Sequence, residues 1–72
     1  MKPFEDLKKA IEFVDSYTGT ADGLELPVSD TLNDSMGMNM AIITDKALAK
    51  GFFPNGFIQK EGYRIFKYKE SS

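Results

Sequence analysis

"GFFPNGFIQKEGYRIFKYKESS", residues 51–72, holds six of the nine aromatic residues of the chain and interleaves them with cations. Pro54-Asn55-Gly56 is typical of a turn, and Glu61-Gly62 separates two β-prone runs, which predicts a hairpin over residues 57–69. A two-residue loop at Glu61-Gly62 would fix the register. It would set Lys60 opposite Tyr63, Gln59 opposite Arg64, Ile58 opposite Ile65 and Phe57 opposite Phe66.

This register places apolar side chains on both faces of the hairpin. One face would carry Ile58, Tyr63 and Ile65 with Lys60 and Lys67, and the other Phe57, Phe66 and Tyr68 with Gln59 and Arg64. Two short helices cannot cover both faces, and an isolated two-stranded hairpin is marginally stable in water. We therefore expect one face to pack on the helices and the other to meet a partner. The predicted interaction residues are Phe57, Tyr63, Arg64, Phe66, Lys67 and Tyr68, with Tyr68 as the main contact.

Upstream, residues 3–17 form an amphipathic pattern. Phe4, Leu7, Ile11 and Val14 recur three and four positions apart, which predicts a helix from about residue 3 to residue 17. Pro3 suits the first turn of that helix, because its missing amide would be unpaired there in any case.

The middle of the chain allows two interpretations. Leu32, Met36, Met40, Ile43 and Ala47 follow a helical stripe, so we expect one helix over residues 30–50. Gly51 would end it in a left-handed conformation. The alternative is a β-strand over residues 38–43. Residues 24–28, LELPV, are expected at most to form a short extended piece.

The expected fold is therefore a single α+β domain over residues 1–72, with two helices followed by a C-terminal antiparallel β-hairpin. A chain of 72 residues without cysteine or histidine has no disulfides, thiol chemistry or imidazole acid–base chemistry. Asp30 and Asp34 lie four apart but lack an orienting histidine or a calcium-loop order, so we interpret them as charges at a helix start. We expect no enzyme activity, no metal and no cofactor.

Charge divides the chain into two halves. Residues 1–36 carry three lysines against eight carboxylates, a net −5, whereas residues 37–72 carry six cations against three carboxylates, a net +3. No motif places the chain in a family, although in general character it resembles short bacterial orphan proteins. Without a signal peptide or a long apolar run, we expect a cytoplasmic protein with no membrane contact.

The predicted function is a small non-catalytic module that binds other proteins, first of all a second copy of itself as a homodimer. Two hairpins joined edge to edge would pair exposed backbone groups and bury the second apolar face. The alternative prediction is a regulator that contacts nucleic acid through Arg64, Lys67 and Lys69 of the aromatic, basic hairpin.

Overall fold

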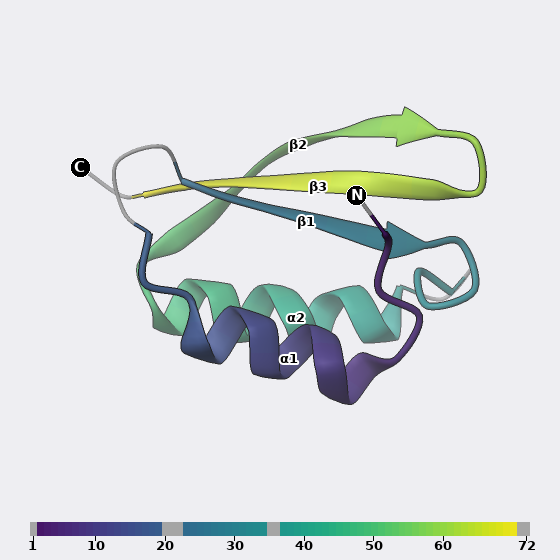
Figure 1. Cartoon of the computed structure of the whole chain (residues 1–72). Helices are drawn as coiled ribbons and strands as arrows, with labels where there is room; N and C mark the ends of the chain where they lie inside the picture. Colours follow the sequence, from purple (N-terminus) through teal and green to yellow (C-terminus); the bar gives the residue numbers. More distant parts are fainter. Residues whose placement is uncertain (1, 20–22, 35–36, 71–72) are drawn as a thin grey trace.

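The chain folds into one layer of sheet and one layer of helices (Figure 1). The structure, a computed structural model, describes residues 2–19, 23–34 and 37–70. Its elements are α1 (Leu7–Ser16), β1 (Leu24–Ser29), α2 (Met38–Ala49), β2 (Phe52–Lys60) and β3 (Tyr63–Glu70). The three strands are antiparallel in the order β1-β3-β2, and both helices lie on the same face of the sheet. The α+β class is confirmed, and both helices precede the C-terminal hairpin, but the predicted order is incomplete because β1 lies between the helices.

Helix α1 begins later than predicted. Asp6 is its N-cap, and the Asp6 carboxylate accepts a hydrogen bond of 2.8 Å from the amide of Lys8. Phe4 is extended and forms a parallel β-bridge with Val28, so it belongs to the sheet rather than to the helix. The predicted start at residue 3 is wrong because an aspartate that caps an amide two residues ahead sets the first turn.

Strand β1 gains its structure from a neighbour that lies far away in sequence. It pairs with β3 over its whole length, from Leu24 opposite Tyr68 to Ser29 opposite Tyr63. Its side chains at positions 24, 26 and 28 are fully buried against the helices. This pairing makes β3 the central strand and gives the sheet three strands instead of the expected two.

Helix α2 covers only part of the predicted 30–50 range. Gly37, at φ 72°, precedes its first residue, Met38, and the strand alternative for residues 38–43 is wrong. Leu32 reaches the core from a turn, where the hydroxyl of Ser29 accepts a hydrogen bond of 3.1 Å from the Leu32 amide. Met36 of the predicted stripe lies outside the described residues. At the other end the prediction is confirmed, because Gly51 has φ 89° and its amide donates to the carbonyl of Leu48 at 2.9 Å.

The register of the β2–β3 hairpin matches the prediction from its two-residue loop. Lys60 pairs with Tyr63, Ile58 with Ile65 and Phe57 with Phe66. Pro54-Asn55-Gly56 is not a turn, since β2 runs through it with a β-bulge between Pro54 and Phe57. The extra residue bends the strand and increases its twist.

The core fills the space between the helices and one face of the sheet. Its buried side chains are Ala10 and Val14 of α1, Leu24, Leu26 and Val28 of β1, Met40, Ile43 and Ala47 of α2, together with Leu32, Phe52 and Tyr68. Tyr17 extends the core at one end, where its ring meets Phe52 edge-on at 5.6 Å between centroids. Within the described residues, no helix lies over the opposite face of the sheet (Figure 1).

Candidate interaction surface

Alternation along the strands assigns each hairpin side chain to one of two faces. Tyr68, Phe66 and Arg64 lie opposite the buried Leu24, Leu26 and Val28, so they share the helix-facing side. The residues between them point to the uncovered side, which we call the outer face. Its exposed or half-buried residues are Glu25 of β1, Phe53, Ile58 and Lys60 of β2, and Tyr63, Ile65, Lys67 and Lys69 of β3. Pro27 and Ser29 alternate onto the same side of β1 but are buried.

The six predicted interaction residues are therefore divided between two faces. Tyr63 and Lys67 lie half-buried on the outer face, while Phe57, Phe66 and Arg64 lie on the helix-facing side near the hairpin tip. Phe57 is 50% exposed, and Phe66 is partly buried against the core.

Tyr68, the predicted main contact, is a core residue. Only 4% of its surface is exposed, and its hydroxyl lies 3.0 Å from the hydroxyl of Thr44 in α2. Burial raises the pKa of Tyr68 above its usual value, and the hydrogen bond with Thr44 partly offsets that rise. The expectation of a surface contact at Tyr68 is wrong because β1 and α2 cover it, and β1 was not part of the predicted sheet.

Phe57 and Arg64 form an ordered cluster at the hairpin tip. The Arg64 guanidinium carbon lies 4.5 Å from the centre of the Phe57 ring, and Arg64 Nε donates to the Gln59 side-chain oxygen at 2.7 Å. Phe57 also contacts Phe66, with the ring centroids 5.6 Å apart. These contacts hold the Phe57 ring in a fixed orientation, although half of the Phe57 side chain is exposed.

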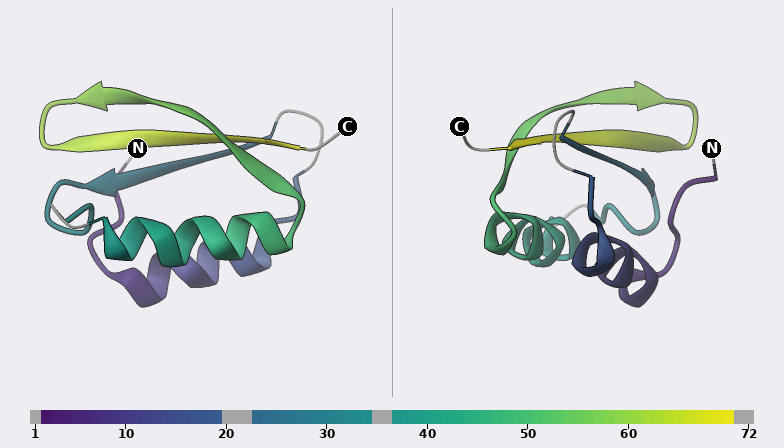
Figure 2. Two further views of the ribbon diagram at one scale, coloured as in Figure 1. Left: turned by 180° about the vertical axis from the view of Figure 1, so that it is seen from behind. Right: turned by 60° about the vertical axis from the view of Figure 1, so that its left-hand side comes forward.

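Exposed apolar side chains gather on two adjacent elements. Among the described residues, the large hydrophobic side chains with substantial exposure are Met38, Ile42 and Leu48 of α2 and Phe53, Phe57 and Ile58 of β2. Seen from behind, α2 lies in front of α1 and β2 crosses in front of the other strands (Figure 2, left). We call this side of the molecule the α2–β2 side. Five of its apolar residues were missed by the sequence analysis; only Phe57 was predicted.

The two edges of the sheet differ. The β1 edge is covered by the N-terminal segment, since the Phe4 amide donates to Pro27 O and the Ser29 amide donates to Phe4 O, both at 2.9 Å. The β2 edge has no strand beside it within the described part of the chain. Pro54 and the bulge interrupt one half of that edge, which leaves the stretch from Phe57 to Lys60 as its regular part.

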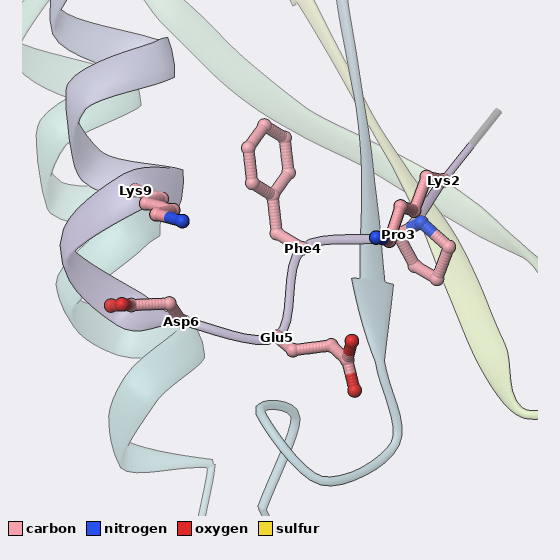
Figure 3. A pocket seen from close by; sticks show the side chains of 6 residues that line it. All are labelled: Lys2, Pro3, Phe4, Glu5, Asp6 and Lys9. Atoms are coloured by element: carbon pink, nitrogen blue, oxygen red, sulfur yellow. The ribbon is translucent and has the colours of Figure 1, made fainter.

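A pocket of about 270 Å³ lies at the start of the chain (Figure 3). It is lined by Lys2, Pro3, Phe4, Glu5, Asp6 and Lys9. The carboxylates of Glu5 and Asp6 point in different directions, and Asp6 already caps α1. The polar groups therefore do not converge on one position, as they do in a binding site for a small molecule.

Residues 2–19, 23–34 and 37–70 contain no group of three or more histidine, cysteine, aspartate or glutamate side chains placed to hold a metal ion. In the same residues, no helix has the length and apolar character needed to cross a membrane. Comparison with known proteins found no matching family model, no matching curated protein and no matching solved structure.

Proposed function

We propose that the protein is a self-associating module that dimerises through its α2–β2 side. The observation that supports this most directly is that all the substantially exposed large hydrophobic side chains of the described residues lie on α2 and β2. Exposed apolar patches of this kind mark interaction surfaces on soluble proteins. The same side carries the β2 edge, which has no neighbouring strand among the described residues, so its backbone groups are available for pairing.

A second copy fits this side because the patch can pair with itself about a two-fold axis. With the axis beside Ile58, two β2 strands would run antiparallel, Ile58 would meet its own copy, and Phe57 would lie opposite Gln59 of the second copy. The arrangement joins two three-stranded sheets into one of six strands.

Size also favours a second copy as the partner. A domain of about 70 residues buries a small core and often depends on a partner subunit for stability. A stable dimer buries roughly 800 Å² on each partner. The accessible surface of the chain is 4715 Å², so one side of the molecule is large enough to supply an interface of that area.

The proposal is tested by sedimentation equilibrium of the parent protein and of Ile58→Lys. The parent should sediment as a dimer at micromolar concentrations. Ile58→Lys should sediment as a monomer, because two lysines would face each other across the axis and like charges directly opposite each other destabilise strand pairing. Ile58 is 41% exposed, so the variant should retain the helical content and secondary structure of the parent.

Thr18→Lys is the matched control, since it adds the same charge at an exposed residue just after α1. This variant should remain a dimer. A monomeric parent over the whole micromolar range, or an Ile58→Lys variant as dimeric as Thr18→Lys, contradicts association through β2.

A further inference from the structure

The outer face concentrates positive charge on an acidic protein. Lys60, Lys67 and Lys69 lie on it against one carboxylate, Glu25, which gives this face +2 in a chain whose net charge is −2. Lys60 and Lys69 are exposed, whereas Lys67 is half-buried opposite Glu25. The lysines thus form a local patch that an anionic partner would complement.

Each exposed lysine has an aromatic neighbour across the strand pair. Lys60 lies opposite Tyr63 near the hairpin loop, and Lys69 lies opposite Phe53 at the other end of the strands. Between them, Ile58 and Ile65 face each other, while Pro27, the next residue in this row, is buried. The six residue steps from Tyr63 to Lys69 cover about 20 Å at the usual rise of a strand.

We infer that the outer face binds single-stranded nucleic acid along β3. Bases stack on exposed aromatic rings while cations contact the phosphates, and an uncovered antiparallel sheet with helices behind it is a surface suited to both. The two aromatic–lysine pairs would hold the two ends of a short strand, and Ile58 and Ile65 would support the bases between them.

A second copy is a poor occupant of this face. If two outer faces packed against each other, their lysines would lose hydration and lie close to other positive charges. Both effects raise the free energy of the complex. Phe53 and Ile58 belong both to the outer face and to the α2–β2 side, but pairing two β2 strands edge to edge adds strands beside the sheet and places nothing over its outer face. The nucleic-acid proposal therefore holds for a monomer and for a dimer alike. Arg64 is not part of this site because it lies on the helix-facing side, stacked on Phe57.

The test is fluorescence anisotropy with a labelled oligothymidylate of about ten nucleotides, a length within the usual site sizes for single strands. The parent should bind it, with an affinity that falls as salt rises, by a slope of about −0.7 per phosphate contact. Lys60→Gln combined with Lys69→Gln should weaken binding and reduce the slope by about 1.4. Tyr63→Leu should weaken binding about tenfold and leave the slope unchanged, since it removes stacking and no charge.

Lys8→Gln combined with Lys9→Gln is the matched control, because it removes the same charge from exposed positions on α1, behind the sheet. It should bind like the parent. Absence of binding at about 100 μM protein and low salt, the weak limit of non-specific association, overturns the inference. A second result also overturns it: polyglutamate binds with the same affinity as the oligonucleotide, and Tyr63→Leu does not change the affinity for either. The face would then be a site for acidic polypeptides.

Discussion

Gly51 and Gly23 both have positive φ angles, 89° and 79°, but their surroundings differ. A Cβ atom at Gly51 would meet nothing within 4 Å, so a substitution there changes only the backbone conformation. A Cβ atom at Gly23 would collide with the backbone oxygen of Tyr68 on the neighbouring strand. The two sites therefore separate the cost of a left-handed backbone from the cost of a steric clash.

Gly51→Val should lower the free energy of unfolding by about 1 kcal/mol or more, because β-branched residues resist positive φ. Gly51→Asn should cost less, since asparagine tolerates this conformation. Gly23→Ala should cost more than Gly51→Ala, because β1 or β3 must also shift. Urea denaturation of the four variants measures these differences. Equal losses for the two alanine variants would show that the strands relax around residue 23 without cost.

At the scale of the elements, sequence reasoning succeeded where local chemistry determines the geometry. The Glu61-Gly62 loop sets the hairpin register, and the alternation of side chains then follows from the pleat. Gly51 likewise ends α2 through its own conformational freedom. These features depend on residues that are close together in the chain.

The missed features depend on distant contacts. β1 contains Pro27 and becomes a strand by pairing with β3, about forty residues later. Leu32 fits the helical stripe of α2 but reaches the core from a turn. Without β1 in the predicted sheet, Tyr68 is expected at the surface, but β1 and α2 bury it. One missing strand thus accounts for the error at Tyr68.

The Tyr68–Thr44 hydrogen bond connects the helix layer to the sheet, and the burial of Tyr68 makes the protein less stable at high pH. Because burial raises the pKa of Tyr68 in the folded protein, its contribution is fully present below the unfolded value of 10.0 and is lost as the pH rises through the higher folded value. Tyr68→Phe should cost about 1 kcal/mol near neutral pH through the lost hydrogen bond. The difference from the parent should shrink above pH 10, as followed by thermal melts across that range. A constant difference would show that Tyr68 titrates alike in both states.

At the scale of the whole molecule, the proposed dimer would leave the β1 edge of each copy as the place where a further copy could add. A dimer through β2 ends in two β1 edges, each covered by Phe4 and its two backbone hydrogen bonds. Removing residues 1–5 leaves the Asp6 cap in place and uncovers β1. The shortened protein should form species larger than dimers in light scattering, because each copy then has two open edges.

Phe4→Leu keeps the backbone bonds of the covering segment and should remain a dimer, which makes it the control for the shortened protein. Adding Ile58→Lys to the shortened protein should return it to smaller species, since one of its two open edges would be blocked. A shortened protein that stays dimeric would show that the N-terminal segment has no part in limiting assembly.

The bulge in β2 would also limit how long two copies stay together in the proposed dimer. Pro54 lacks an amide, and the bulge that follows it interrupts regular pairing, so backbone contact is confined to about four residues per strand. A joint of this length opens without unfolding either copy. We therefore expect subunits to exchange rapidly between dimers, so that a mixture of differently labelled proteins reaches a random distribution of pairs soon after mixing.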